Sequence, residues 1–296
     1  MADALRIRAH AKINLLLRVL AREADGFHGL ETVFARLDLY DELVAERTDA
    51  RGVTLDVEGA DCGPTEENLA VRAARLVLDG TGNRFGVRLR LVKRIPVGAG
   101  LGGGSADAAA ALDLVNRLAG DAVPRHELLQ YAARLGADVP FLWSGAPLAL
   151  GWGHGERLLR LAPLPDRPIL LLLPPVSVRT AEAYGWVDQV RTDTTRRGAV
   201  TYDANVLGSW GDLARLAGND FEAVVFARHP EVRDGFEALA RTRPLFCRMS
   251  GSGSTLFAVY RTERDREDAA MQLGRKHGVA VSASLLTSPP EGPAPT

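Results

Sequence analysis

The spacing of apolar residues predicts a chain that mixes strands and helices. Strict alternation of apolar and polar side chains over residues 5–9, 32–40 and 87–91 is typical of strands with one buried face, and an apolar run over 13–20 extends this strand-rich part. Apolar positions at helical spacing predict helices over 69–77 and 125–135, the second ending at Gly136. The first half of the chain therefore combines several strands with amphipathic helices.

The pattern changes at a cluster of prolines, Pro163, Pro165 and Pro168, which marks a candidate domain boundary. We therefore expect one domain over residues 1–160 and a second over 161–287. In the second, strands are expected to alternate with helices as in a split α/β sandwich. The strands are expected over 169–173, 245–249 and 256–260, and the helices over 180–190, 220–227, 232–241 and 263–277. Four prolines within 288–296 predict a disordered tail.

A glycine-rich loop, residues 98–104, joins a predicted strand to an alanine-rich helix. Glycine admits positive φ and carries no side chain, so this backbone can curl with its N–H groups pointing inward. Ser105 occupies the expected N-cap position of the helix. Unpaired N–H groups and the positive end of the helix dipole would then meet at one point, and this combination predicts a phosphate site.

The common phosphate-loop templates fit this stretch poorly. The Walker pattern fails because no Lys lies within 98–105. A dinucleotide-binding fingerprint matches Gly98, Gly100 and Gly103, but the strand and acidic residue that should follow are missing. A protein-kinase loop would need Val where Ser105 stands. A flexible turn without a ligand is the remaining alternative, and the entropy lost in ordering so many glycines argues for a compensating ligand.

Composition and charge argue against several classes of function. The 296 residues are 46% hydrophobic and 25% charged, as in globular proteins, and a formal net charge of −1 gives no field that favours nucleic acid or an anionic membrane. Cys62 and Cys247 are too few and too far apart for a metal cluster or disulfide framework. Charged residues interrupt the apolar N-terminus, so neither a signal peptide nor a membrane span is expected. We expect a cytoplasmic monomer or weak homodimer without nucleic-acid or membrane partners.

Two further stretches carry candidate chemistry. Lys12 and Asn14 share one face of an extended chain, where Lys12 could either lie at an exposed edge or aim its ammonium at phosphate oxygens. Asp138 precedes Pro140 in a predicted constrained loop, and its carboxylate fits either an Asx turn or a fixed general base. The glycine-rich turn over 250–254 is expected to close a hairpin, and its N–H groups could also touch a phosphate.

Three separated stretches together resemble the GHMP small-molecule kinases, a superfamily named for its galactose, homoserine, mevalonate and phosphomevalonate members. They are AKINL at residues 11–15, PVGAGLGGGSADA at 96–108 and MSGSGS at 249–254. Three more motifs resemble the branch of this superfamily that acts on a cytidine diphosphate-linked methylerythritol in the non-mevalonate isoprenoid pathway. These are ADGFH at 24–28, LGADVP at 135–140 and NDFE at 219–222. The resemblance runs almost from end to end.

The resemblance implies a two-domain α/β (α+β) kinase with its active site in the cleft between the domains. The N-terminal domain would resemble ribosomal protein S5 domain 2, and the C-terminal domain would be a ferredoxin-like α/β sandwich. ATP with Mg²⁺ would be the donor, and the 2-hydroxyl of the methylerythritol the acceptor. By motif position, Asp138 would be the catalytic base and Lys12 its partner. The chemistry agrees, because a carboxylate can take the proton of an alcohol while a nearby ammonium stabilises transferred negative charge.

The same resemblance implies binding roles. Phe27, His28 and Tyr184 would recognise cytosine, since aromatic rings stack on a base while hydrogen bonds distinguish cytosine from uracil. Asn14 and Thr180 would contact the erythritol or diphosphate. No protein ligand for the metal is firm, and Ser105 is the one candidate Mg²⁺ contact. The nucleotide site would comprise Asn68 and Lys93 at the adenine, and the loop residues Pro96, Val97, Gly98, Ala99, Gly100, Leu101, Gly102, Gly103, Gly104, Ser105 and Ala106.

Two alternatives stay open at this point. One is a GHMP kinase for another small alcohol such as mevalonate or homoserine, which would not need an aromatic base pocket. The other is a non-catalytic nucleotide-binding protein on the same fold, against which the presence of Lys12 and Asp138 argues. Arg179 stands before Thr180 where Pro is typical of the family, and Phe27 replaces the usual Tyr while keeping the stacking face.

Overall fold

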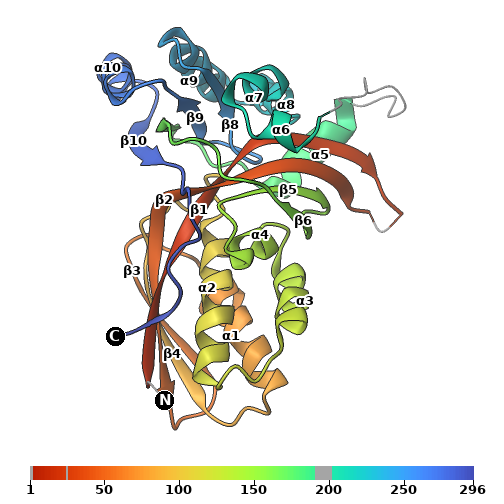
Figure 1. The fold of residues 1–296 in the computed structure, drawn as a ribbon, viewed down its shortest axis with the longest axis vertical. Coiled ribbons are helices and arrows are strands. Elements are labelled where there is room, and N and C mark those ends of the chain that lie inside the picture. Colours follow the sequence, from red (N-terminus) through yellow and green to blue (C-terminus); the bar gives the residue numbers. More distant parts are fainter. Residues whose placement is uncertain (1–2, 25, 191–201) are drawn as a thin grey trace.

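The computed structural model describes residues 3–24, 26–190 and 202–296 and consists of two sheets layered with helices (Figure 1). Asp25, part of the ADGFH motif, lies outside the described residues. The larger sheet has the strand order β11-β1-β2-β4-β3, with β5 paired to β2 and β6 to β5. Its strands are β1 (Ala4–Arg22), β2 (His28–Thr48), β3 (Val53–Glu58), β4 (Gly86–Val92), β5 (Leu148–Gly153), β6 (Arg157–Arg160) and β11 (Ala294–Pro295).

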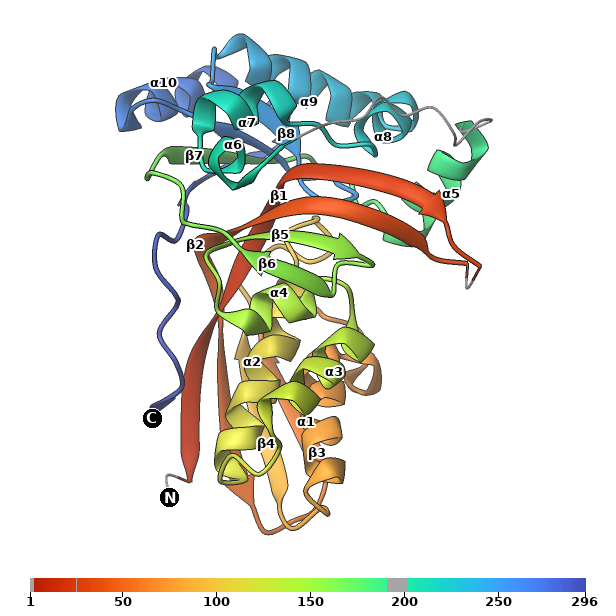
Figure 2. The ribbon, with the colours of Figure 1, turned by 45° about the vertical axis from the view of Figure 1, so that its right-hand side comes forward.

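Strands β1 and β2 form a long hairpin (Figure 2). It reaches from the first layer, which is the larger sheet with its helices, to the second layer, which is the smaller sheet with its helices. Its register shifts between His10 and Lys12 and again between Asn14 and Leu16. Such irregularities bend a strand and redirect its side chains. The polar interruption between the runs 5–9 and 13–20 therefore marks bends within one strand.

Helices α1 (Leu69–Gly80), α2 (Gly103–Leu118), α3 (Arg125–Leu135) and α4 (Val139–Ser144) accompany the larger sheet, and a 3₁₀ turn, η1 (Thr65–Glu67), precedes α1. The alanines of α2 are buried and let this helix pack closely on α1, β1 and β2. The structure corrects two predictions here. Gly102, not Ser105, is the N-cap of α2. Asp138 lies directly before a helix instead of within a loop, because Pro140 is tolerated in the first turn of α4.

The second sheet has the order β10-β7-β9-β8, built from β7 (Pro168–Leu173), β8 (Phe246–Met249), β9 (Leu256–Val259) and β10 (Val279–Ser284). Numbered along the chain, this order is 4-1-3-2, with helices between the first and second strands and between the third and fourth. That is the ferredoxin-like pattern, so the predicted sandwich is confirmed. The helices are α5 (Thr180–Val190), α6 (Ala204–Leu207), α7 (Trp210–Leu216), α8 (Glu222–Arg228), α9 (Pro230–Arg241) and α10 (Glu263–Leu273).

Strand β7 is apolar throughout because both of its faces are buried. Ile169 and Leu171 join the core of the first layer, whereas Leu170 and Leu172 join the core beneath α8, α9 and α10. The predicted division at residues 160 and 161 falls in the connection between β6 and β7, and it stays a prediction.

The tail differs from its prediction. Instead of being disordered, Ala294 and Pro295 pair with Arg6 and Leu5 on the edge of the larger sheet. Proline is compatible with an edge strand, where its missing N–H faces away from the ladder. No helix within the described ranges is long and apolar enough to cross a bilayer.

A buried charge cluster joins β2, β4 and α2. The ammonium of Lys93 is paired with Asp41 and lies 2.8 Å from an oxygen of Asp107. Asp41 is fully buried, and its other oxygen accepts a hydrogen bond of 2.8 Å from the backbone N–H of Ile95. The cluster therefore fixes the backbone that leads from β4 into the glycine loop.

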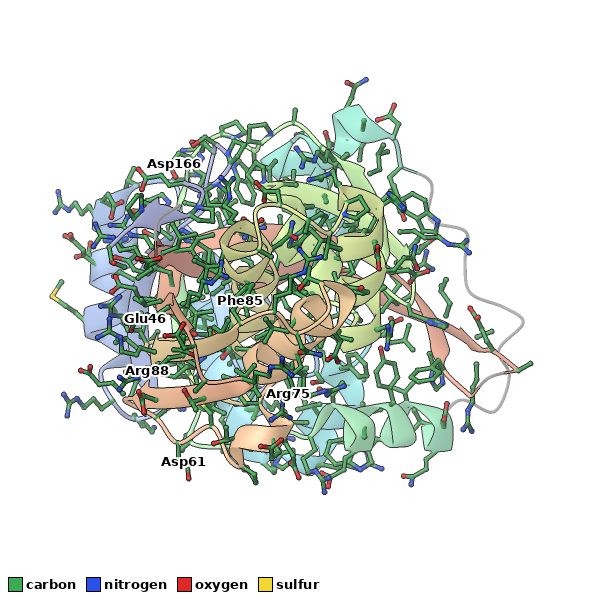
Figure 3. All side chains as sticks on the ribbon, turned by 90° about the horizontal axis from the view of Figure 1, so that it is seen from below. Glu46, Asp61, Arg75, Phe85, Arg88 and Asp166 are labelled. Atoms are coloured by element: carbon green, nitrogen blue, oxygen red, sulfur yellow. The ribbon has the colours of Figure 1, made fainter. Side chains whose placement is uncertain are left out.

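We expect Asp41→Ala to lower the free energy of unfolding by about 3–5 kcal/mol, because it leaves a buried ammonium with one carboxylate and removes the acceptor of a buried N–H. Urea denaturation measures this change. Asp56→Ala is the control: Asp56 pairs with Arg88 at 2.8 Å, but both side chains are more than half exposed. Arg88 lies beside its cross-strand partner Glu46 on the larger sheet (Figure 3). Equal losses in both variants would contradict the structural role of the buried cluster.

Candidate active site

A cavity of about 1240 Å³ lies where the two layers and the β1–β2 hairpin meet. Nearly all of the predicted site residues line it: Lys12, Asn14, Phe27, His28, Asn68, Lys93, Pro96–Ser105, Asp138, Thr180 and Tyr184. Ala106 is the exception. Its side chain is buried in the core, because the early start of α2 turns this position away from the cavity. Residues that lie far apart in the sequence therefore line a single cavity.

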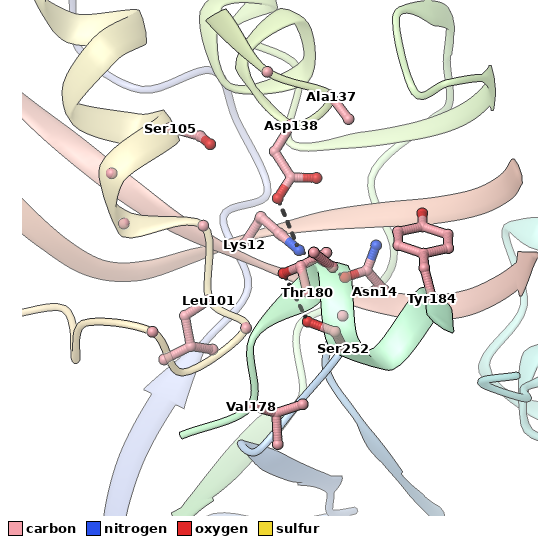
Figure 4. A pocket seen from close by; sticks show the side chains of 18 of the residues that line it. Lys12, Asn14, Leu101, Ser105, Ala137, Asp138, Val178, Thr180, Tyr184 and Ser252 are labelled. Carbon is pink, nitrogen blue, oxygen red and sulfur yellow. Dashed lines mark hydrogen bonds and ion pairs between the residues drawn. The ribbon is translucent and has the colours of Figure 1, made fainter. Parts of the chain in front are cut away.

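The ammonium of Lys12 lies in the lining of this cavity, close to Asp138 and Asn14 (Figure 4). It is 3.1 Å from Oδ2 of Asp138 and donates to Oδ1 of Asn14 at 2.8 Å. The side chain of Lys12 is only 4% exposed, whereas that of Asp138 is 28% exposed. An ammonium has three donors, and the third has no acceptor among the described residues. The pair can therefore offer a ligand both a carboxylate oxygen and a free N–H.

A short relay of hydrogen bonds fixes the amide of Asn14. Its Nδ2 donates to Oγ1 of Thr32 at 2.8 Å, and this hydroxyl donates to the carbonyl of Leu16 at 2.7 Å. With Nδ2 engaged in this way, Oδ1 faces Lys12 as an acceptor. Asn14 thus orients the ammonium while its side chain also lines the cavity.

Arg36 holds the opposite end of the helix that follows Asp138. Its guanidinium donates to the carbonyls of Phe141, Leu142 and Ala146 at 3.1, 2.8 and 3.2 Å. Burial lowers the pKa of Arg36 to about 10, so the group remains a cation at neutral pH. A cation at the C-terminus of α4 satisfies carbonyls that the helix leaves unpaired. Arg36 therefore anchors the short helix whose first turn positions Asp138.

The glycine loop has the conformation that a phosphate cradle needs. Gly98, Gly100 and Gly102 adopt φ values of +67°, +78° and +71°. The backbone N–H of Lys12 donates to the carbonyl of Leu101 at 2.9 Å, and the hydroxyl of Ser250 donates to that of Gly100 at 2.9 Å. The N-cap residue of α2, Gly102, has no side chain with which to cap the helix. Its first N–H groups can therefore bind an anion.

The two residues predicted to border the adenine, Asn68 and Lys93, both make structural contacts within the protein. Asn68 caps α1, accepting from the N–H of Ala70 at 2.9 Å, and Lys93 is held between its two carboxylates. Oδ1 of Asp107 is buried and has no partner among the described residues. Burial raises the pKa of Asp107 to about 7, although the ammonium of Lys93 acts in the opposite direction. Lys93 thus lines the cavity with its charge already neutralised.

A group of aromatic side chains forms part of the cavity wall. The ring of His28 stacks on that of Tyr184 at 5.1 Å and 19°, and Tyr184 meets Phe221 edge-on at 4.9 Å. Phe27 is 64% exposed and its ring lies 5.3 Å from that of His154. Burial, and secondarily the charge of Asp138, raises the pKa of Tyr184 to about 12, so its hydroxyl stays protonated. Phe27 and Tyr184 line the same cavity but do not face each other as a closed sandwich.

The turn between β8 and β9 forms the remaining wall. Oγ of Ser252 lies 3.0 Å from Oγ1 of Thr180, the first residue of α5. Nδ2 of Asn219 donates to the carbonyls of Met249 and Gly251, each at 2.7 Å, and thereby holds this turn in place. The NDFE motif thus acts as a support for the turn, and motif position alone did not indicate this role.

Several charged or polar residues of the lining were not predicted, among them Arg22, Glu67, Asp107, Arg134, His154, Glu156 and Asp188. Asp107 belongs to the glycine-loop motif, which did not indicate a role for its side chain. His154 and Asp188 lie outside all of the sequence motifs. Among the described residues, no group of three or more His, Cys, Asp or Glu side chains could hold a metal ion. A divalent cation at this site would therefore need most of its ligands from phosphate oxygens and water, with Ser105 nearby as a hydroxyl.

Comparison with known proteins finds relatives along the whole chain. Residues 68–146 match the family described as GHMP kinases N terminal domain, and residues 201–280 match GHMP kinases C terminal. The 4-diphosphocytidyl-2-C-methyl-D-erythritol kinase of Nitratidesulfovibrio vulgaris is 40% identical over 97% of this chain and 100% of its own. The kinase of the same name from Pelotomaculum thermopropionicum is 41% identical over 85% of this chain and 87% of its own.

The fold comparison agrees with these sequence matches. A crystal structure of 4-(cytidine 5'-diphospho)-2C-methyl-D-erythritol kinase has a TM-score of 0.77 and 36% identity, covering 95% of this chain and 98% of that one. The similarity therefore extends over both layers of the fold.

Two glycine substitutions test the conformation of the loop. At Gly100, a Cβ atom would lie 2.3 Å from the carbonyl oxygen of Ser250, and φ is positive. We expect Gly100→Ala to lower the free energy of unfolding by about 1–3 kcal/mol. At Gly104, in the first turn of α2, the nearest atom would be Cδ1 of Leu69 at 3.7 Å. Gly104→Ala should stabilise the protein by about 0.5–1 kcal/mol in the same urea denaturation experiment. A stabilising Gly100→Ala would refute the loop conformation.

Proposed function

The chain belongs to the 4-diphosphocytidyl-2-C-methyl-D-erythritol kinase family of the GHMP kinases, and we propose that it transfers the γ-phosphoryl group of ATP to the 2-hydroxyl of 4-diphosphocytidyl-2-C-methyl-D-erythritol. The products are the 2-phosphate and ADP, in non-mevalonate isoprenoid precursor biosynthesis. The observation that carries this proposal is the Lys12–Asp138 pair, which lies in one cavity with a glycine loop and an aromatic group.

In the proposed reaction, Asp138 is the catalytic base. A hydroxyl beside its exposed carboxylate can give up its proton as the oxygen attacks the γ-phosphorus, and the bond from phosphorus to the β,γ-bridging oxygen breaks. Lys12 pairs with the carboxylate of Asp138 and offers its third N–H to the transferred phosphoryl group. Because Lys12 is fixed by Asn14 and Asp138, these charges are aligned before substrate binds.

The glycine loop and the N-terminus of α2 would bind the triphosphate. The support for this assignment is the run of positive φ values and the uncapped helix N-terminus. Asn68 and Lys93 would border the adenine. Mg²⁺ would arrive with ATP, held mainly by phosphate oxygens and water with Ser105 as a candidate contact, and would neutralise phosphate charge when bound.

The acceptor would lie with its cytosine toward Phe27, His28 and Tyr184 and with its erythritol toward Asn14 and Thr180. Support comes from the position of the aromatic residues in the same cavity as Asp138. Exposed Phe27 offers a stacking surface, and a base on such a surface gains about 1–3 kcal/mol. The 1–160 and 161–287 division, the cytoplasmic location and the monomer or weak homodimer stay predictions.

We expect Asp138→Asn to lower kcat by about 10²–10⁴-fold, because the amide keeps the shape of the side chain but cannot accept the proton. ATP affinity, measured by calorimetry, should change little. Asp212→Asn is a suitable control, since Asp212 forms an exposed ion pair of 3.7 Å with Arg215 on α7. Near-normal turnover of the Asp138 variant would exclude this residue as the base.

A panel of acceptors separates the proposal from its alternatives. Purified protein should phosphorylate 4-diphosphocytidyl-2-C-methyl-D-erythritol with a kcat/KM far above that for mevalonate or homoserine, since neither alcohol has a base for the aromatic residues. Coupled detection of ADP measures all three. Preference for mevalonate or homoserine would overturn the acceptor assignment, and binding of ATP without any transfer would favour a non-catalytic protein.

A further inference from the structure

His28 has an environment that the binding role expected for it does not explain. Its side chain is 7% exposed, although it lines the cavity. Tyr184 covers one face of the ring. Nε2 of His28 lies 2.7 Å from Oδ1 of Asp188, and Nδ1 has no partner among the described residues. The imidazole is therefore held at one nitrogen and free at the other.

Asp188 comes from a different element and approaches across the cavity. It lies on α5, whereas His28 begins β2 at the tip of the long hairpin, and the two elements lie side by side in both views (Figures 1 and 2). The second oxygen of Asp188 is 3.9 Å from Nη1 of Arg22. Arg22 also donates from Nε to the carbonyl of Gly26 at 3.0 Å, so it is tied to the tip of the same hairpin. Arg22 therefore places a positive charge beside the carboxylate of Asp188.

An ionised carboxylate accepts hydrogen bonds and cannot donate one. The contact between Asp188 and His28 therefore requires the proton of a neutral imidazole to be on Nε2. The other nitrogen, Nδ1, then carries a lone pair and is an acceptor. The 4-position of cytosine carries an amino group, which donates, whereas the 4-position of uracil carries a carbonyl, which only accepts.

We propose that Asp188 is a positioning residue for base selection. It fixes His28 with Nε2 protonated, so that Nδ1 accepts a hydrogen bond from the amino group of cytosine and repels the carbonyl of uracil. This inference rests on the proposed function, because it assumes a cytidine-linked acceptor. With uracil in the site, the lone pair of Nδ1 would be left without a donor, and a buried polar group without a partner costs binding free energy. Discrimination between the two bases therefore depends on holding the ring of His28 with its proton on Nε2.

The test compares two acceptors that differ only in the base, the cytidine and uridine diphosphate-linked methylerythritols, at pH 8, where free imidazole is neutral. Asp188→Ala should lower the ratio of kcat/KM values, cytidine over uridine, by about tenfold, mainly through a higher KM for the cytidine compound. The KM for ATP should stay unchanged. Asp188→Asn, whose amide oxygen can still accept from Nε2, should restore most of the ratio.

Glu182→Gln is the matched control on the same helix. Glu182 pairs with Arg179 at 3.5 Å and does not line the cavity. This variant should keep the wild-type ratio. Nitrogen-15 spectra of the imidazole give a second readout, and in the wild type they should place the proton of His28 on Nε2.

The outcomes separate this inference from the proposed function. An unchanged base ratio in Asp188→Ala, an equal loss of activity with both acceptors, or a wild-type proton on Nδ1 would each overturn the role of Asp188. If the wild-type protein phosphorylates neither acceptor, the proposed function itself fails.

Discussion

The buried ammonium of Lys12 is the interaction on which the arrangement of the cavity depends. A buried charge without partners would cost several kcal/mol, so the groups that surround it cannot separate freely. Asn14 belongs to the same strand as Lys12, whereas Asp138 precedes α4. The backbone N–H of Lys12 also donates a hydrogen bond to Leu101 in the glycine loop. Strand, loop and helix are thereby held at one point. Arg36 secures the far end of α4, which prevents Asp138 from rotating away with its helix.

The two buried lysines of this cavity illustrate how the number of partners separates structural from chemical roles. Lys93 lies between Asp41 and Asp107, so its charge is neutralised within the protein, and the cluster orders the backbone entering the glycine loop. Lys12 has one carboxylate and one amide oxygen and retains an unpaired donor. Only the second arrangement leaves electrostatic stabilisation available for a charge that develops during a reaction.

Local signals in the sequence were sufficient for much of the fold and, through the motifs, for Lys12, Asp138 and the glycine loop. Periodicity predicted α3 with its observed bounds and identified β7 as a buried strand, because both depend on neighbouring residues. The pairing of β5 with β2 and the docking of Ala294 on β1 were not predicted, since they depend on contacts with distant segments. The same limit applies to the site. Lys12 and Asp138 carried motifs, whereas the approach of Asp188 to His28 joins residues 160 positions apart and had no local pattern.

The long β1–β2 hairpin links chemistry to recognition of the acceptor. Lys12 lies on β1 where its register shifts, and His28 lies at the start of β2, so both ends of the acceptor would be read from one hairpin. Its three register shifts bend the strands, and α5 contacts the tip through Asp188. In the proposed binding mode, the spacing between the reacting hydroxyl and the base would be set by one continuous element. A short alcohol could then reach Asp138 but would leave His28 and Tyr184 without a partner, which would give the proposed acceptor preference a geometric cause.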